Sequence, residues 1–112
     1  MKLSVVMPVY NEIQTIQTII ERVQHIQIEK ELIIVDDYST DGTREYLQTL
    51  QAPNIRILFH PSNQGKGSAL QTGFQHVSGD VVVIQDADLE YDPKDYVPML
   101  EKVVKDNLKI LF

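Results

Sequence analysis

The sequence contains no cysteine, which excludes disulfide bonds and thiolate metal sites and fits a reducing, cytoplasmic environment. No apolar run approaches the ~18 residues of a membrane-spanning helix, and the first apolar stretch is too short for a signal peptide. Positive charge is also scarce, because 10 Lys and Arg residues stand against 16 Asp and Glu residues, giving a net charge of −6. Nucleic acid and anionic membranes are therefore poor partners for this chain unaided.

The rest of the composition is typical of a globular protein. The chain has 112 residues, 43% of them hydrophobic, which predicts one folded domain over residues 1–112 and argues against disorder. Short apolar runs bounded by polar or turn-forming residues predict strands near residues 3–7, 31–35, 55–59, 80–85 and 108–112.

Helix signals alternate with these predicted strands. Asn11 is a candidate cap for a helix that starts near Glu12, and further helices are predicted after the polar segment 39–41, over 66–77 and from Pro93 on. Regular alternation of strand and helix predicts an α/β fold, with a mainly parallel sheet between two helical layers. We therefore expect a Rossmann-like, three-layer α/β/α sandwich.

Polar residues follow three of the predicted strands. In sheets of this kind, ligands bind beyond the carboxyl ends of the strands, so these residues are candidates for a binding site. They are Pro8, Tyr10 and Glu12 after the first strand, Asp36 and Asp37 after the second, and Asp86, Ala87 and Asp88 after the fourth.

Asp86 and Asp88 are the most informative of these candidates. Two carboxylates at positions i and i+2 of an extended segment can point to the same side, and Mg²⁺ prefers such oxygen ligands. Glu90 adds negative charge that a divalent cation would offset. Two simpler interpretations stay open: the pair could cap the next helix, and Asp36 and Asp37 could merely form a turn.

Four segments of the chain, in this order, resemble family 2 glycosyltransferases of the GT-A fold. They are VVMPVYNE (5–12), IVDDYSTDGT (34–43), NQGKGSA (63–69) and QDADLEYDP (85–93). Each segment alone is a weak signal, but the ordered set is specific and covers nearly the whole chain. The resemblance is strongest to the polyprenyl-phosphate (dolichyl-phosphate) mannosyl- and glucosyltransferases.

The resemblance implies a metal-dependent transfer of a hexose from a nucleotide sugar, with a UDP- or GDP-hexose as donor and a polyprenyl phosphate as the expected acceptor. Mg²⁺ or Mn²⁺ would stabilise the charge that the diphosphate leaving group gains. In the context of the family, the reaction would take place at the cytoplasmic face of a membrane. A saccharide acceptor, or donor binding without turnover, remains an alternative.

The resemblance also assigns roles to residues of this chain. Asp86 and Asp88 correspond to the catalytic DxD pair that holds the metal and the diphosphate, with the small Ala87 between them and Glu90 as a further metal ligand. The other candidates would bind the nucleotide sugar. They are Pro8, Tyr10 and Glu12 in the nucleoside loop, Asp37 or its neighbour Asp36 at the base or ribose, and Lys66 near the phosphates.

Competing α/β classes place their motifs elsewhere. Receiver domains and haloacid-dehalogenase-like phosphatases carry acids after the first strand, where this chain has Pro8-Val9-Tyr10, and a Rossmann dehydrogenase needs a G-x-G-x-x-G that is absent. The chain stops at Phe112, near the start of the predicted fifth strand. We therefore expect either a truncated glycosyltransferase or a homodimer that pairs this open edge.

Overall fold

The computed structural model describes residues 2–88 and the short strand at 110–111. Strands and helices alternate in the order β1 (Leu3–Val9), α1 (Ile16–His25), β2 (Lys30–Asp36), α2 (Thr43–Gln48), β3 (Ile55–Phe59), α3 (Lys66–Phe74), β4 (Val81–Ile84) and β5 (Ile110–Leu111). The five predicted strands are all present, and the helix predicted from Pro93 on lies outside the described residues.

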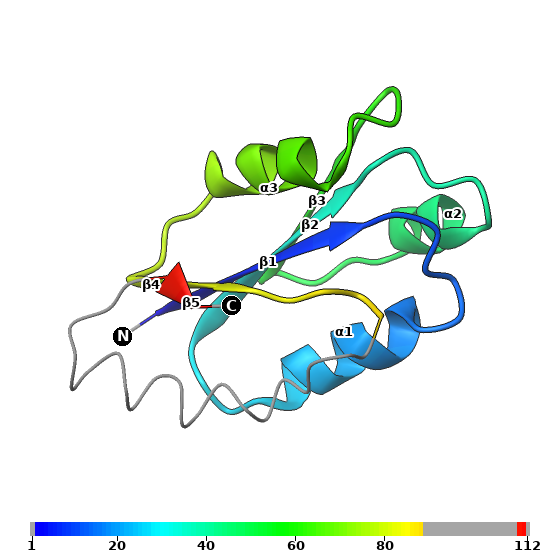
Figure 1. The fold of residues 1–112 in the computed structure, drawn as a ribbon. Helices are drawn as coiled ribbons and strands as arrows, with labels where there is room; N and C mark the ends of the chain where they lie inside the picture. The colour runs from blue at the N-terminus through cyan, green and yellow to red at the C-terminus, as the bar shows by residue number, and fades with distance from the viewer. Residues whose placement is uncertain (1, 89–109, 112) are drawn as a thin grey trace.

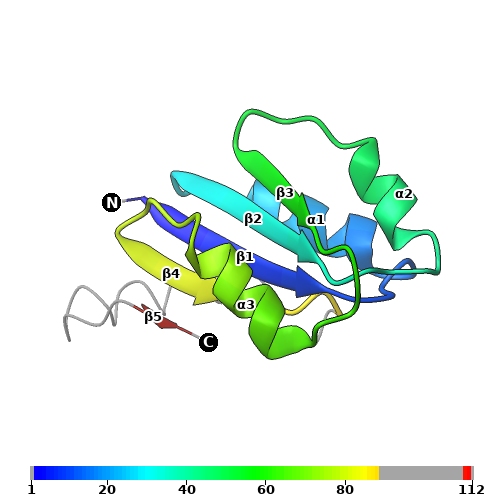
Figure 2. The same ribbon diagram turned by 90° about the horizontal axis from the view of Figure 1, so that it is seen from above.

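The strands form one parallel sheet in the order β3-β2-β1-β4-β5 (Figures 1 and 2). β1 lies in the middle, and the order of the strands reverses between β1 and β4. In open α/β sheets this reversal point opens a crevice at the carboxyl ends of the strands. The topology therefore predicts a ligand site beyond the ends of β1 and β4.

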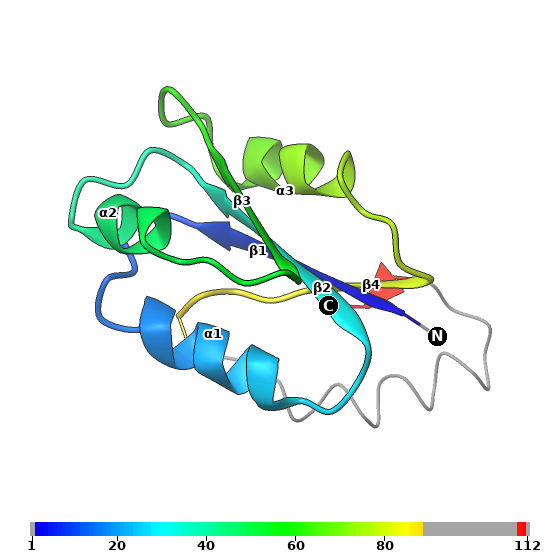
Figure 3. The same cartoon turned by 180° about the vertical axis from the view of Figure 1, so that it is seen from behind.

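Helices cover both faces of the sheet, as the views from front and back show (Figures 1 and 3). α1 and α2 pack on one face, where the buried side chains of α1 meet alternate residues of β1. α3 packs on the other face, against the buried Ile33 and Val35 of β2. Because both faces are covered, β1 is buried along its whole length and is apolar except for Ser4.

The first helix starts later than the sequence predicts. α1 begins at Ile16, not near Glu12, and Asn11 does not cap it. Asn11 instead has a positive φ of 53°, and its side-chain carbonyl accepts a hydrogen bond from the backbone N–H of Thr40. This hydrogen bond connects the loop after β1 to the loop after β2. The third helix, α3, ends at Phe74, three residues before its predicted end at residue 77.

Candidate active site at the carboxyl ends of the strands

A cleft of about 430 Å³ opens where the strand order reverses. It is formed by the ends of β1, β2 and β4 and by the start of α3. Most of the predicted site residues line it, together with Val9, Asn63, Gly65 and Ala69, which lie in the quoted segments 5–12 and 63–69 but were not predicted as site residues. The predicted residues in the cleft are Pro8, Tyr10, Glu12, Asp37, Lys66, Asp86, Ala87 and Asp88.

The acid pair follows directly from the end of β4. The backbone N–H of Gln85 donates to the carbonyl of Val6 over 2.9 Å, so the chain stays paired with β1 up to the acids. Ala87 is buried, and its carbonyl accepts a hydrogen bond of 2.5 Å from the hydroxyl of Thr15. This bond ties the turn that carries Asp86 and Asp88 to the residue just before α1.

Lys66 faces the acid pair from the first turn of α3. Its ammonium nitrogen lies 2.7 Å from Oδ1 of Asp86. Both side chains remain in contact with solvent, so the ion pair itself contributes little to stability. Its importance is positional, because it brings a cation and a carboxylate together across a cleft of the size that a small ligand needs.

Glu12 adds a third acid to this part of the cleft. Partial burial raises the pKa of its carboxyl group; the negative charges of Asp88, Asp41 and Asp86 raise it further, and a hydrogen bond with Thr15 only partly opposes the rise. This repulsion among carboxylates would be relieved by a bound cation.

The donor atoms suit a hard divalent cation. Asp86 and Asp88 offer carboxylate oxygens, which Mg²⁺ and Mn²⁺ accept, although no cluster of three metal-ligating side chains forms among residues 2–88. Mg²⁺ is often held by only one or two carboxylates, with water and substrate phosphates as its other ligands. The described residues therefore fit a cation that binds together with a phosphorylated ligand. The predicted ligand Glu90 lies outside the described residues.

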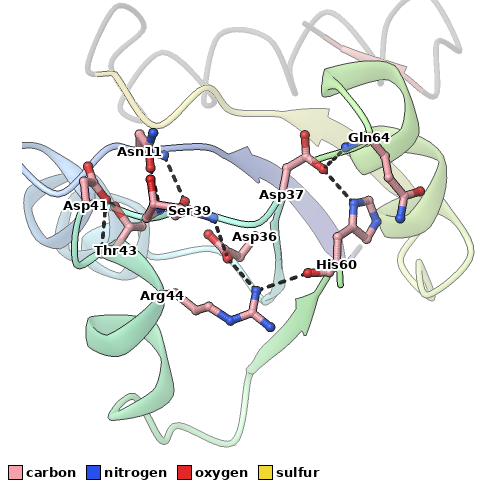
Figure 4. Close-up of polar contacts among 10 residues, drawn as sticks. Asn11, Asp36, Asp37, Ser39, Asp41, Thr43, Arg44, His60 and Gln64 are labelled. Carbon is pink, nitrogen blue, oxygen red and sulfur yellow. Dashed lines mark hydrogen bonds and ion pairs between the residues drawn. The ribbon is translucent and has the colours of Figure 1, made fainter. Parts of the chain in front are cut away.

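Asp37 lies in the wall of the cleft, at the end of β2 (Figure 4). Burial alone would raise the pKa of its carboxyl group, but hydrogen bonds from the backbone of Gln64, from His60 and from the backbone of Gly65 outweigh burial and lower the pKa. Asp37 is therefore a firmly ionised carboxylate that connects the end of β2 to the loop before α3.

Asp36 does not line the cleft, so of the two neighbours only Asp37 is in a position to contact a ligand. The side chain of Asp36 is fully buried, and its Oδ2 forms an ion pair of 3.1 Å with Arg44 (Figure 4). Arg44, on α2, is therefore held at the end of β2 by a buried carboxylate. Its guanidinium also donates to the carbonyl of His60 and lies over the ring of Phe59.

The polar segment after β2 holds the loop after β1. The hydroxyl of Ser39 accepts a hydrogen bond from the backbone N–H of Asn11, and the hydroxyl of Thr43 accepts one from that of Glu12. Asp41 accepts from the backbone N–H of Ile13. This segment therefore positions the loop that carries Tyr10 and Glu12.

Sequence reasoning missed three residues that shape the site. Thr15 binds the acid-pair turn, His60 binds Asp37, and Arg44 neutralises Asp36. Their partners are 72, 23 and 8 residues away in the chain, so no local spacing pattern could reveal these contacts. The one available signal was the place of His60 directly after the strand 55–59.

A parallel α/β sheet with acids at its reversal point defines a class of proteins that bind ligands at the strand ends. Within this class, residues 4–112 match the sequence profile of Glycosyl transferase family 2, and the chain belongs to this family. The predicted family is thereby confirmed, and the solved structures described below confirm the predicted GT-A-type fold.

The chain is similar to two curated transferases. It is 34% identical over 113 residues to a dolichol-phosphate mannosyltransferase of Pyrococcus furiosus, covering 98% of this chain and 32% of that protein. It is 36% identical over 118 residues to an undecaprenyl-phosphate 4-deoxy-4-formamido-L-arabinose transferase of Photorhabdus laumondii, covering 98% of this chain and 36% of that protein. The chain thus spans about a third of the length of these relatives.

Solved structures with the same fold include a mannosyltransferase from Pyrobaculum calidifontis in complex with GDP-Man and Mn²⁺. That protein matches with a TM-score of 0.77 and 28% identity over 90% of this chain and 32% of its own. TarS of S. aureus in complex with UDP-GlcNAc matches with a TM-score of 0.80 at 23% identity, over 94% of this chain and 32% of its own, which supports the fold alone. None of the described helices is long and apolar enough to cross a membrane.

Proposed function

We propose that this chain forms the donor-binding part of a metal-dependent glycosyltransferase that transfers a hexose from a UDP- or GDP-sugar to a polyprenyl phosphate. The observation that carries the proposal is the cleft at the strand reversal, which is lined by Asp86, Asp88 and Glu12 and where the ammonium of Lys66 pairs with Asp86. Family membership and the names of the two curated relatives support sugar transfer to a polyprenyl phosphate. The similar mannosyltransferase solved with GDP-Man supports a nucleotide-sugar donor.

The proposed roles follow from the placement of the side chains. Asp86 and Asp88 would hold Mg²⁺ or Mn²⁺, which supplies Lewis-acid stabilisation of the diphosphate leaving group. Lys66, at the start of α3, would stabilise the same negative charge from the other side of the cleft. Tyr10 and Asp37 line the part of the cleft beyond β1 and β2, where the nucleoside would lie.

The proposed acceptor determines where the reaction takes place. A polyprenyl phosphate resides in a membrane and presents a phosphate that is ionised at neutral pH, so a strong general base is unnecessary. We therefore place the transfer at a membrane surface.

Calorimetric titration tests the donor site. UDP- and GDP-sugars are titrated with and without Mn²⁺ into the wild-type chain, the Asp86→Asn/Asp88→Asn variant and a Glu21→Gln/Glu45→Gln variant that changes the net charge equally on the exposed surface. We expect Mn²⁺-dependent binding of one donor by the wild type and the control, and affinity at least tenfold lower in the acid-pair variant. Equal donor affinity in all three proteins would refute the metal-site assignment.

A transfer assay separates an enzyme from a donor-binding module. The chain is incubated with labelled nucleotide sugar, Mn²⁺ and polyprenyl phosphate in detergent, and the lipid phase is assayed for label. Label in the lipid phase supports the full proposal. Tight donor binding without transfer would restrict the function of this chain to donor binding.

A further inference from the structure

His60 belongs to none of the predicted roles, yet it is a buried, titratable side chain against the wall of the cleft. It is 6% exposed, and both of its ring nitrogens are engaged. Nδ1 lies 2.9 Å from Oδ1 of Asp37 (Figure 4), and Nε2 lies 2.8 Å from the hydroxyl oxygen of Thr72 on α3. A buried side chain with two specific partners has a fixed orientation.

The partner at Nδ1 determines which ring nitrogen carries the proton. An ionised carboxylate can only accept hydrogen bonds, so Nδ1 of His60 must donate to Asp37. In the neutral ring, Nε2 then accepts a hydrogen bond from the hydroxyl of Thr72. The result is a directional chain in which Thr72 donates to His60 and His60 donates to Asp37.

This chain of hydrogen bonds connects α3 to the ends of two strands. Asp37 also accepts from the backbone N–H groups of Gln64 and Gly65, each over 2.8 Å. The backbone N–H of His60 donates to the carbonyl of Asp36 over 2.9 Å. The loop 61–65 is therefore attached to the end of β2 through a single carboxylate, whose remaining partner is His60.

The attached loop delivers the start of α3 to the cleft. Lys66 follows directly after Gly65, and its ammonium lies 2.7 Å from Asp86. If Asp37 turned away, the loop would lose two backbone hydrogen bonds at once. The start of α3, which carries Lys66, would then no longer be held in place. His60 therefore contacts the carboxylate that holds the loop before Lys66, although His60 does not itself line the cleft.

We propose that His60 is a positioning residue for nucleotide binding: through its Nδ1–H it holds Asp37, and through Asp37 it sets the loop 61–65 and Lys66 against the diphosphate of the donor. The proposal rests on the proposed function for its ligand, and on the described contacts for the coupling.

Two substitutions at one position distinguish the two nitrogens of the ring. In His60→Asn, the amide nitrogen can take the place of Nδ1 and donate to Asp37, whereas in His60→Gln the amide oxygen can take the place of Nε2 and accept only from Thr72. Affinities for UDP and GDP are measured with Mn²⁺ by calorimetry. We expect His60→Asn to bind within about threefold of the wild type and His60→Gln at least tenfold more weakly. A role in packing alone would weaken both variants alike, and that result would overturn the proposal.

A second readout needs no nucleotide. Amide hydrogen exchange of Gln64 and Gly65 reports whether Asp37 still holds the loop, and we expect faster exchange in His60→Gln than in His60→Asn. Thr72→Val, which removes only the hydroxyl partner, should change exchange in the same direction by a smaller factor. Exposed His25, changed to Asn and to Gln, is the matched control and should change neither readout.

The two readouts separate the two hypotheses. If the wild type binds neither nucleotide but His60→Gln speeds exchange at Gln64 and Gly65, the proposed function fails while the coupling from His60 to the loop is supported. Wild-type exchange rates at both amides in a folded His60→Gln variant would overturn the coupling, whatever the nucleotide affinities are.

Discussion

Thr15 precedes the first turn of α1, yet its hydroxyl contacts the turn after β4. It donates to the carbonyl of Ala87 over 2.5 Å and also lies 3.3 Å from Oε2 of Glu12. One hydroxyl group therefore contacts both the acid-pair turn and the loop after β1. Because it acts on a main-chain carbonyl, it can set the direction of the turn without being a metal ligand.

Thr15→Val removes this hydroxyl at nearly constant volume. We expect the affinity for Mn²⁺ in the presence of nucleotide to fall about fivefold, which corresponds to the loss of about 1 kcal/mol for one hydrogen bond. Thr15→Ser, which keeps the hydroxyl, should retain wild-type affinity, and Thr18→Val on the exposed side of α1 is a surface control. Calorimetry compares the four proteins; equal losses in the Val and Ser variants would contradict the role of the hydroxyl.

At the scale of single residues, the sequence predicted most of the side chains that lie in the cleft. It did not predict the contacts that hold them there. Asp37 and Asp86 could be predicted because they follow strands, and ligands bind at the carboxyl ends of parallel strands. Asp36 ends the same strand as Asp37 but points away, because successive side chains of a strand face opposite sides. Asp36 pairs there with Arg44, and local sequence does not show which of the two neighbours has this partner.

The elements that surround the cleft pack closely, and α3 shows this most clearly. Its Gly73 faces β1, where an added Cβ atom would lie 2.5 Å from Cγ1 of Val6. Real Cβ atoms do not approach other atoms so closely, so this glycine allows α3 to sit directly on the sheet. Gly67, in the first turn of the same helix, has no atom within 4 Å of an added Cβ.

The two glycines of α3 predict opposite effects of the same substitution. Gly73→Ala should lower the free energy of unfolding by about 1–3 kcal/mol, because Val6 is buried and cannot move aside without strain. Gly67→Ala should leave it unchanged or raise it by up to about 1 kcal/mol, because alanine favours helix. Urea denaturation measures both, and a Gly73→Ala variant as stable as Gly67→Ala would contradict the close packing of α3.

At the scale of elements, the strands and their order along the chain could be predicted, because a sheet covered on both faces favours strands that are mostly apolar. The start of α1 could not. Asn11 is a good candidate cap from its position, but its side chain binds Thr40 on another loop instead. A local cap signal cannot show that a partner 29 residues away competes for the same side chain.

At the scale of the whole molecule, the amino and carboxyl ends of the sheet have different tasks. The carboxyl ends carry the cleft, and at the amino end Glu31 joins β2 to β1 and to the segment before β4. Its carboxylate accepts hydrogen bonds from the hydroxyl of Ser4 and from the backbone and hydroxyl of Ser78. Burial would raise the pKa of Glu31, but these bonds, with a contribution from Lys2, lower it below its usual value.

This lowered pKa predicts a pH dependence of stability. A carboxyl group whose pKa is lower in the folded state stabilises the fold above its unfolded pKa, and this contribution disappears as pH falls through the folded pKa. Glu31→Gln should therefore lower the free energy of unfolding at pH 7 by about 1–2 kcal/mol, and the gap to the wild type should shrink in acid. Urea denaturation at several pH values measures the gap, with exposed Glu45→Gln as control; a gap that stays constant with pH would contradict the prediction.

The hydrogen bonds between the loops after β1 and β2 have a consequence for redesign of the protein. Ser39, Asp41 and Thr43 hold the backbone of residues 11–13, so each loop is part of the scaffold of the other. Grafting one loop from a relative with a different donor preference would leave the recipient loop without its partners. An exchange of specificity between family members would have to transplant both loops as one unit, even though they are about 30 residues apart in the chain.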